Sequence, residues 1–549
     1  MGYPVGMDLR DFPLGSDNLH WLLIKGIGLL SGDAVVVTNL YYFASFALVA
    51  LSAFFVARAL GTSRRAGFVV AMLYTFLPYH FLRGTGHLQL AAYFSVPIAC
   101  LLVVRVWTDD PPFFRRVDGR MRLEWKEWRT LWYVVGALVI ASSGLYYAAF
   151  CITLLVAVAL LRLAVGRNWT TGASALLLCA VIGGGVLVNT APSILYRLEH
   201  GRNTEVIDRT VQESDIYALR PIQLLSPTPG HRVEQLDQIA AEVLSARNYS
   251  DATPFLGLVG AAGFLGLMIL LLGLGGRTRR GERAPPLLLR LAALTALATL
   301  IGVTGGLSWI IGLAGLTEIR AWNRISVFIA FFALLAVAIW LDRFVAWLPR
   351  FRWKALAVSA GTLLLVALAV LDQTNSFIIP DSRVFAAEWD SDDDFVQAIE
   401  RRLGPGDAVF QLPYLPFPEG ALDLPPYGME DYDPFRGYLH SDDLRWSYGA
   451  MRGREGDWQA QVVELGTKEM LDAVAAVGFR GLWVDRLGYP EEGAAVEDDL
   501  RDLLGEAPIV SPDERFVFFD LRPWAAELRN RLGTDGVRAL RAETLRNVG

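Results

Sequence analysis

Residues 35–60 read VVVTNLYYFASFALVALSAFFVARAL, an apolar run in which Arg58 is the one charged side chain. A helix of about 20 apolar residues is long enough to cross the hydrocarbon core of a bilayer. Nine more apolar segments follow along the chain, at residues 66–82, 88–106, 131–145, 147–161, 173–189, 255–275, 287–304, 325–340 and 355–371. The pattern predicts a polytopic α-helical membrane protein with about ten spans. Because the fourth and fifth segments are short and nearly continuous, we expect Ser142, Ser143 and Gly144 to separate them into two helices.

The composition of the whole chain agrees with this class. The chain has 549 residues, 53% of them hydrophobic and 19% charged, and a mean hydropathy of +0.36. These values exclude a disordered or collagen-like chain. Because the hydrophobic residues gather in long runs, an ordinary soluble enzyme is disfavoured. Cys100, Cys151 and Cys179 all lie in apolar runs, so the sequence shows no disulfide framework and no thiolate metal site.

The charge changes sign near residue 372. Residues 372–549 hold 35 acidic and 18 basic side chains, whereas the preceding residues hold 21 acidic and 32 basic ones. Helical patterns at 393–402, 460–477 and 498–505 alternate with strand-like stretches at 408–412, 481–485 and 515–521. We expect three regions: an outer loop and interfacial helix at 1–34, a multi-span membrane domain at 35–371 with a large outer loop at 190–254, and a soluble α/β domain at 372–549.

Basic residues gather in every second connection between the apolar segments, at 64–65, 115–129, 162–167, 277–283 and 350–354. Short cytoplasmic loops carry an excess of Lys and Arg. The alternation predicts a multi-pass protein of the cytoplasmic membrane, with these loops inside and the α/β domain on the extracytoplasmic side. This topology leaves Met1 outside although no signal peptide is visible, so we expect one further helix upstream of Met1.

The opening residues carry the first candidate site. Asp8 and Asp11 lie in a loop broken by Gly and Pro, ahead of an amphipathic run at 18–30 that suits a helix lying in the membrane interface. Two carboxylates are thereby placed just above the bilayer. The alternative interpretation is that both are ordinary polar residues of a turn.

A second cluster lies in PYHFLRGTGHL, at residues 78–88. His80, Arg83 and His87 fall together at the predicted outer end of a span. A cation there can bind a phosphate group, and a histidine can relay a proton. The alternative is interfacial anchoring by aromatic and basic side chains.

Three more arginines are predicted on the outer side. Arg320 and Arg324 lie in LTEIRAWNRIS at 316–326. They are four residues apart, so on a helix they share one face and can hold a phosphate between two guanidinium groups. Arg197 lies near the membrane edge of the large outer loop and is a further candidate for phosphate binding.

Other kinds of chemistry are weakly represented. Trp446, Tyr448 and Trp458 in the acidic tail are of the type that stacks on sugars, although packing against the membrane domain would use them equally well. The sequence has no HExxH or carboxylate-rich metal motif, no P-loop and no Ser/His/Asp set. The cofactor is therefore unknown, and a divalent metal ion stays open. The basic residues form no single patch, which argues against nucleic acid as a partner.

Together these features resemble the GT-C superfamily of integral-membrane glycosyltransferases. The resemblance rests on the layout of the chain and, locally, on Met1–Leu30, Pro78–Leu88 and Ile319–Arg324. It implies an enzyme that moves a sugar from a polyprenyl-phosphate carrier to a glycan, lipid or protein acceptor at the outer face of the membrane. It also implies that an acidic residue of the first outer loop acts as general base, with Asp8 as the first choice and Asp11 as the second.

The same resemblance implies that cations at the outer membrane face hold the carrier phosphate, with Arg83, Arg320 and Arg324 as candidates and His80 and His87 in support. Two other functions fit such a layout: a transporter or flippase of lipid-linked glycans, and a non-catalytic assembly factor. The polar candidates lie at outer helix ends rather than along a central pathway, and no internal repeat is visible. Both observations favour the glycosyltransferase over the transporter.

Overall fold

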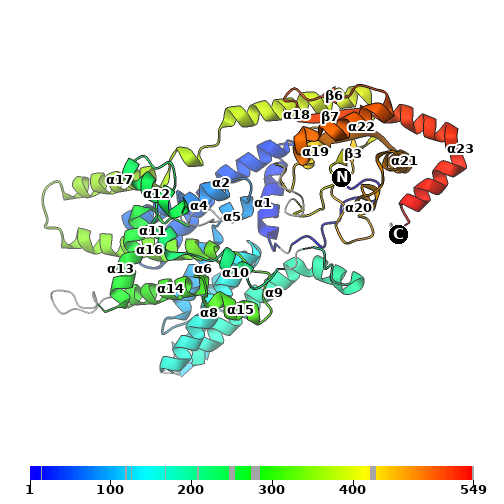
Figure 1. The fold of residues 1–549 in the computed structure, drawn as a ribbon. Helices are drawn as coiled ribbons and strands as arrows, with labels where there is room; N and C mark the ends of the chain where they lie inside the picture. The colour runs from blue at the N-terminus through cyan, green and yellow to red at the C-terminus, as the bar shows by residue number, and fades with distance from the viewer. Residues whose placement is uncertain are drawn as a thin grey trace. The chain divides into compact units, whose positions relative to one another are not determined.

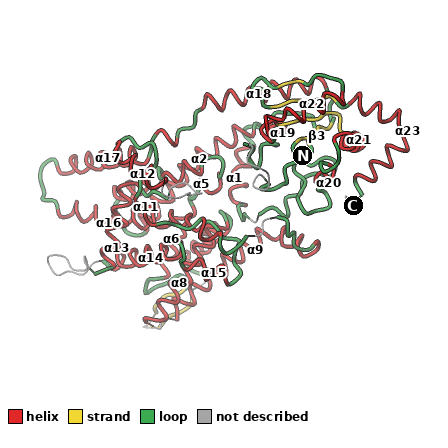
Figure 2. Tube along the Cα trace, in the orientation of Figure 1, coloured by secondary structure: helices red, strands yellow, loops and turns green. Residues whose placement is uncertain are grey.

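The computed structural model describes residues 1–13, 15–117, 120–124, 126–166, 169–206, 209–245, 254–273, 285–420 and 428–546. The chain divides into two compact units (Figure 1). The first comprises Met1–Pro13, Pro192–Asp208 and Asp381–Gly549, and the second comprises Leu14–Ala191 and Arg209–Pro380. Helices predominate in the second unit, whereas the larger sheet belongs to the first (Figure 2).

The second unit is built mainly from the apolar segments. Its longer helices are α1 (Asn18–Gly28), α2 (Ala34–Ala59), α3 (Arg64–Thr75), α6 (Ser95–Val106), α7 (Trp128–Ala141), α8 (Leu145–Gly166), α9 (Trp169–His200), α12 (Glu234–Ser245), α13 (Gly257–Leu271), α14 (Pro286–Gly302), α16 (Ser326–Trp347) and α17 (Lys354–Gln373). Its short elements are α4 (Pro78–Arg83), α5 (Leu88–Ala91), α10 (Glu213–Ile216), α11 (Pro221–Leu225), α15 (Leu307–Leu313), η1 (Trp322–Ile325), η2 (Ser376–Ile378) and the antiparallel pair β1 (Phe114–Val117) and β2 (Arg120–Leu123). Helix α9 passes from the second unit into the first at Pro192.

Five helices are long and apolar enough to cross a membrane by length and composition: α2, α8, α9, η1 with α16, and α17. Four shorter apolar helices, α6, α7, α13 and α14, accompany them. Every segment predicted as a span contains helix, but two of them are broken. Segment 66–82 is interrupted before Pro78, which lacks the amide hydrogen that a continuing helix needs and therefore begins α4. Segment 88–106 is interrupted between α5 and α6. The number of ten spans, like the sidedness of the loops, stays a prediction, and the basic loop at 277–283 lies outside the described residues.

The turn between α7 and α8 lies where the sequence predicts it. Residues Ser142–Gly144 separate the two helices, and Gly144 has φ of +110°, a conformation that side-chain-bearing residues rarely adopt. The segment before α1 is bonded to this turn: Gly144 N donates to Ser16 O at 3.2 Å and Leu145 N donates to Gly15 O at 2.7 Å. The start of α1 is thereby fixed beside the start of α8.

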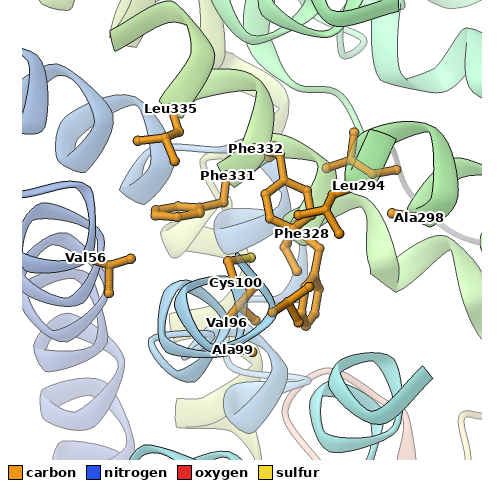
Figure 3. Close-up of a cluster of buried hydrophobic side chains, with 14 of the residues drawn as sticks. Val56, Val96, Ala99, Cys100, Leu294, Ala298, Phe328, Phe331, Phe332 and Leu335 are labelled. Carbon is orange, nitrogen blue, oxygen red and sulfur yellow. The ribbon is translucent and has the colours of Figure 1, made fainter. Parts of the chain in front are cut away.

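The core of the second unit is centred on α16. Phe328, Phe331 and Phe332 are fully buried against side chains of α2, α6 and α14 (Figure 3). Helix α13 approaches α16 closely at Gly263, where an added Cβ would lie 2.5 Å from the backbone oxygen of Ala333. Small residues at such positions let helix backbones pack without a gap.

The first unit contains a five-stranded sheet in the order β4-β3-β5-β7-β6. Its strands are β3 (Ala408–Leu412), β4 (Arg445–Trp446), β5 (Phe479–Asp485), β6 (Ile509–Val510) and β7 (Phe516–Asp520). Strand β3 is parallel to β4 and β5, whereas β7 is antiparallel to β5 and β6. In this register Phe410 is paired with Leu482, and Trp483 with Phe518.

Helices pack on the sheet of the first unit. They are α18 (Ser382–Arg402), α19 (Phe435–Leu439), α20 (Gln459–Val462), α21 (Thr467–Val477), α22 (Ala494–Leu504) and α23 (Arg522–Thr544), with the short helices η4 (Arg486–Gly488) and η5 (Pro490–Gly493). Phe395 of α18 packs on Trp446 and Trp483, whereas α21 packs on the cluster that contains Phe410. Trp446 and Trp458 are 0% and 1% exposed. They are core residues of their own unit, so their interpretation as sugar-stacking platforms is wrong.

The first residues of the chain are hydrogen-bonded to the segment that contains β4. Gly2 N donates to Tyr448 O at 2.7 Å, and Tyr3 N donates to Trp446 O at 3.0 Å. The Tyr3 ring meets Phe479 edge-on, with 5.2 Å between the centroids. Met1–Pro13 thus belongs to the α/β unit, although more than a hundred residues of apolar helix follow it in the sequence.

Candidate functional site

The eight residues predicted for the site are divided between the two units. Asp8, Asp11 and Arg197 belong to the first, and His80, Arg83, His87, Arg320 and Arg324 belong to the second. Each group is described within its own unit.

The Asp8 carboxylate is paired with a neighbouring arginine, Arg10. Nε of Arg10 lies 2.9 Å from each of its carboxylate oxygens, and Nη2 bonds Oδ2 at 2.5 Å. The Arg10 guanidinium also lies over the Tyr196 ring, 4.2 Å from its centroid. These hydrogen bonds from Arg10 hold the pKa of Asp8 below its ordinary value. Asp8, whose side chain is 40% exposed, is therefore accessible but weakly basic.

Asp11 connects three segments of the first unit. Its side chain is 2% exposed, with Arg454 Nε 2.5 Å from Oδ2 and Arg197 Nε 3.8 Å from Oδ1. Arg454 also donates to the backbone oxygens of His200 and Gly201, each at 2.9 Å. The structure thus brings Asp11 and Arg197 together, and in this arrangement the two form part of a buried charge network.

The second unit contains a carboxylate that sequence reasoning missed. Asp17 stands directly before α1, and Leu19 N donates to Ser142 O at 2.9 Å, so the residue is held against the turn between α7 and α8. An added Cβ at Gly144 would lie 3.2 Å from Asp17 Oδ1 and 3.9 Å from Tyr147 Cδ2. The carboxylate and the phenol ring therefore flank the same glycine. The one sign of this residue in the sequence is its position directly before the amphipathic run at 18–30.

Asp17 has an unusual electrostatic environment. Its carboxylate makes no hydrogen bond or ion pair within the described part of the chain, and its side chain is half-buried. Burial raises the pKa of Asp17 to about 7. A carboxyl group with such a pKa can take up and release a proton near neutrality, as a general base requires.

Two of the predicted arginines meet at a group of tyrosines. Arg83 lies over the Tyr79 ring, 5.1 Å from its centroid, and Arg324 lies over the Tyr146 ring at 4.3 Å. The guanidinium groups of both arginines act electrostatically on the hydroxyl group of Tyr147. We call Tyr79, Arg83, Tyr146, Tyr147 and Arg324 the arginine–tyrosine cluster.

Hydrogen bonds fix the centre of the arginine–tyrosine cluster. The hydroxyl oxygens of Tyr79 and Tyr147 are 3.2 Å apart, and the Tyr147 hydroxyl donates to Leu90 O at 2.6 Å. Nε of Arg324 is buried and has no hydrogen-bond partner among the described residues. The cluster therefore concentrates positive charge beside Tyr147, the residue that flanks Gly144 together with Asp17.

Arg320 does not share a helix face with Arg324, contrary to the prediction. Helix η1 begins at Trp322, so Arg320 lies in the loop before it. Arg320 Nη1 donates to Glu213 Oε2 at 2.9 Å, and the guanidinium lies 5.1 Å from the Tyr217 ring centroid. This ion pair links Arg320 to α10 and offsets its charge.

The two predicted histidines differ in their surroundings. His80 is fully buried: Nε2 lies 2.8 Å from Ser45 Oγ, Nδ1 lies 3.0 Å from Thr75 O, and the ring stacks on Phe46 with 3.8 Å between centroids. These contacts make His80 a packing residue between α2 and α4. His87 is exposed at the N-terminal end of α5.

A metal site is not evident in the described part of the chain. No group of three or more His, Cys, Asp or Glu side chains there is arranged to hold a metal ion. The polar groups that come together are instead carboxylate, guanidinium and phenol. Such a set can bind a phosphate and accept a proton.

Comparison with solved structures gives distant likenesses. No protein-family model and no curated protein matches the chain. The chain is similar to the crystal structure of ArnT from Cupriavidus metallidurans bound to undecaprenyl phosphate, with 14% identity, 93% of this chain and 88% of that chain covered, and a TM-score of 0.46. It is also similar to ArnT from the same organism in the apo state, with 13% identity, coverages of 95% and 94%, and a TM-score of 0.38.

Proposed function

We propose that this chain is a membrane glycosyltransferase that moves a sugar from a polyprenyl-phosphate carrier to an acceptor hydroxyl, with Asp17 as general base and the arginine–tyrosine cluster as the phosphate site. One observation carries the proposal. The Asp17 carboxylate has no cationic partner among the described residues and lies beside Gly144. Tyr147, which flanks the same glycine, belongs to the arginine–tyrosine cluster with its two guanidinium groups. Proton acceptor and phosphate site are the two parts that such a transfer needs.

The residues divide the reaction between them. Asp17 accepts the proton of the acceptor hydroxyl while that oxygen bonds to the anomeric carbon of the sugar. The bond between this carbon and the phosphate oxygen breaks, and its electron pair leaves with the carrier phosphate. Arg83 and Arg324 stabilise the charge that develops there, because guanidinium groups match phosphate geometry. The apolar helices of the second unit offer surroundings in which a polyprenyl chain is soluble.

Asp8 and Asp11 stay as alternative bases. Asp8 would have to release Arg10 before it could take a proton efficiently, and Asp11 would have to leave Arg454. Asp17 needs no such rearrangement. This difference favours Asp17.

The cellular setting belongs to the same proposal. The alternation of basic loops supports a position in the cytoplasmic membrane, with the site and the α/β unit on the extracytoplasmic side. Arg320, His80 and His87 then support the site rather than bind the reacting phosphate, and Arg197 stays in the charge network of the first unit. The acceptor is a glycan, a lipid or a protein.

The test is sugar transfer by the purified full chain in lipid nanodiscs, supplied with a panel of polyprenyl-phosphate sugars. The variants are Asp17→Asn, Asp8→Asn, Asp11→Asn, Arg83→Gln and Arg324→Gln. Asp33→Asn is the matched control, because Asp33 lies in the same part of the chain and caps α2, and asparagine is an equally good N-cap. Binding of polyprenyl phosphate is measured in parallel.

We expect Asp17→Asn to lose at least a hundredfold in turnover while it still binds the carrier, because a general base contributes about 10²–10⁴-fold. Arg83→Gln and Arg324→Gln should weaken carrier binding, and Asp33→Asn should behave as the wild type. Loss of turnover in Asp8→Asn with full turnover in Asp17→Asn would move the base to Asp8. Carrier binding without turnover of any donor would contradict the enzyme and favour a transporter.

A further inference from the structure

Two cavities near the end of α16 share the lining residues Asp342 and Ala346. The larger has a volume of about 500 Å³ and lies between the start of α3, α16 and α17, with Arg64 and Arg65 in its wall. The smaller has a volume of about 320 Å³ and lies between the α2–α3 turn, the start of α14 and α16, with Arg343 in its wall. All of these residues belong to the second unit. We call the two cavities together the basic cavity.

The charges in the wall of the basic cavity do not cancel. Asp342 Oδ2 accepts a hydrogen bond from Ser63 N at 2.7 Å, so this carboxylate is bonded to the residue that caps α3. Arg64, Arg65 and Arg343 are exposed, and none of their guanidinium groups forms an ion pair or a hydrogen bond within the described part of the chain. Three cations therefore stand against a single carboxylate.

The rest of the larger cavity has an apolar wall. Val345 and Val358 line it, and the hydroxyl group of Thr362 is already bonded within α17, where it donates to Val358 O at 2.7 Å. Trp347 and Trp353, which follow shortly after the cavity residues of α16, are both exposed. Exposed tryptophans are enriched where a membrane protein crosses the interface between lipid and water. The basic cavity thus combines cations and an apolar wall at the level of lipid headgroups.

Helix α16 separates the basic cavity from the arginine–tyrosine cluster. Arg324 lies in η1, directly before α16, whereas Asp342 lies near the other end of that helix. From Ser326 to Asp342 an α-helix rises about 24 Å, and the hydrocarbon core of a bilayer is about 30 Å thick. The two places therefore lie near opposite ends of a helix that is long and apolar enough to cross a membrane. The basic residues at 64–65 and 350–354 predict the cytoplasmic side for the basic cavity.

We propose that the basic cavity binds the headgroup of an anionic phospholipid, with Arg64 and Arg65 on the phosphate oxygens and an acyl chain along Val345 and Val358. Guanidinium groups match the geometry of a phosphate group, and basic pockets between membrane helices bind anionic headgroups. A free phosphate ion would meet the same cations, but the apolar wall gives it no contact, which favours the lipid. The inference goes beyond sugar transfer and holds whether or not the chain is a glycosyltransferase.

The experiment is a lipid titration of the purified full chain, followed by native mass spectrometry from detergent micelles. The probes are phosphatidylglycerol, which is anionic, and phosphatidylcholine, which has a phosphodiester but no net charge. Inorganic phosphate is added as a competitor. The variants of the cavity are the double variant Arg64→Gln/Arg65→Gln and the single variant Ala346→Trp, which places a large side chain in both cavities without a change of charge.

Two control variants distinguish the basic cavity from other cations. Arg115→Gln/Arg116→Gln removes two adjacent exposed arginines that are predicted on the same side of the membrane and line neither cavity. Arg83→Gln/Arg324→Gln removes the cations of the arginine–tyrosine cluster, so it reports any lipid that occupies the proposed carrier site.

We expect phosphatidylglycerol to bind the wild type about tenfold or more tightly than phosphatidylcholine. Each arginine beside an anionic lipid contributes roughly fivefold in affinity, so Arg64→Gln/Arg65→Gln should bind phosphatidylglycerol roughly 30-fold more weakly. Ala346→Trp should also weaken binding, because it fills the space that the lipid needs. Both control variants should bind phosphatidylglycerol like the wild type, and inorganic phosphate should not displace it.

Three results would overturn the inference. Equal losses in Arg64→Gln/Arg65→Gln and Arg115→Gln/Arg116→Gln, with none in Ala346→Trp, would show that surface charge alone attracts the lipid. Loss of binding only in Arg83→Gln/Arg324→Gln would place the lipid at the arginine–tyrosine cluster. Displacement of phosphatidylglycerol by inorganic phosphate would identify the basic cavity as a site for free phosphate.

Discussion

Replacement of Asp11 by asparagine should lower stability and leave the chemistry intact. Asparagine keeps the shape of the side chain and one acceptor oxygen for Arg454, but it removes the charge that faces Arg454 and Arg197. A hydrogen bond to a charged group contributes about 1.5–3 kcal/mol. Arg454 retains the backbone oxygens of His200 and Gly201, and its side chain is 19% exposed, so water offsets part of the loss.

We therefore expect Asp11→Asn to lower the free energy of unfolding by an amount within this range rather than above it. For a unit of 150–250 residues, 1 kcal/mol corresponds to about 2–4 °C in Tm, which gives a decrease of roughly 3–12 °C. The assay follows heat-induced protease sensitivity of the first unit in the detergent-purified full chain. Asp8→Asn is the control from the same segment, and its shift should be smaller because the Asp8–Arg10 pair is exposed.

Turnover per folded molecule completes the measurement. At a temperature at which the variant stays folded, Asp11→Asn should retain most of the wild-type turnover, since Asp11 holds segments together and does not meet the substrate. A variant that unfolds like the wild type but has lost its turnover would refute this reasoning and restore Asp11 as a base.

Three further outcomes are expected. Burial raises the pKa of Asp457 to about 6 from its ordinary value near 3.8. The ionisation of Asp457 therefore lowers the stability of the folded chain as the pH rises from about 4 to about 6. Asp457→Asn should raise Tm at pH 7.5, by the equivalent of about 1–3 kcal/mol, and should give no gain at pH 4. A lower Tm of this variant at pH 7.5 would contradict the prediction. Gly144→Ala places a methyl group toward Asp17 on a residue whose φ is +110°, so transfer activity should fall. The fall should be much larger than with Gly184→Ala, a helical position with open space around an added Cβ. Equal activities of the two variants would show that the turn does not position the carboxylate. Gly263→Leu places a side chain against the backbone of α16, so the yield of folded protein in fluorescence-detected size-exclusion chromatography should fall sharply. A yield equal to that of the wild type would show that the contact between α13 and α16 is not tight.

Much of the helical architecture could be predicted from the sequence, because apolar runs of this length have few alternative structures. The run at 35–60 coincides with α2 to within one residue at each end, and the strand at 408–412 coincides with β3. The helix predicted at 460–477 is divided into α20 and α21, since Gly466 interrupts it. Strands β4 and β6 have two residues each, too few for an alternating pattern to be visible.

The site was less accessible to sequence reasoning, because its properties depend on partners. Asp8, Asp11 and Asp17 are equivalent acidic residues in the sequence. Only the fold pairs the first two with arginines, whereas Asp17 has no such partner among the residues that the structure describes. His80 carries no sign in the sequence that it would be enclosed by Ser45 and Phe46. Local spacing placed Arg83 correctly at a helix end, where the cluster of tyrosines from α8 could not be foreseen.

The tyrosines illustrate the limit most clearly. Tyr147 begins one predicted span and Tyr146 directly precedes it, so neither stands out from the apolar sequence around it. Tyr147 becomes important because its ring flanks Gly144 together with Asp17, and Tyr146 because Arg324, from a segment more than 170 residues later, lies over its ring. Contacts over such a separation leave no periodic trace in a single sequence.

The pairing of Gly2 and Tyr3 with the strand that contains Trp446 has a consequence for how the protein is made. A chain grows at about 5–20 residues per second during synthesis. Roughly 440 residues separate Tyr3 from Trp446, so the opening segment waits roughly 20–90 s before its bonding partners are made. Throughout that interval the backbone amides of Gly2 and Tyr3 lack the carbonyl oxygens to which they later donate, while helix after helix enters the bilayer. A segment that precedes the membrane helices in the chain thus completes its hydrogen bonds only after residues that follow those helices have been made.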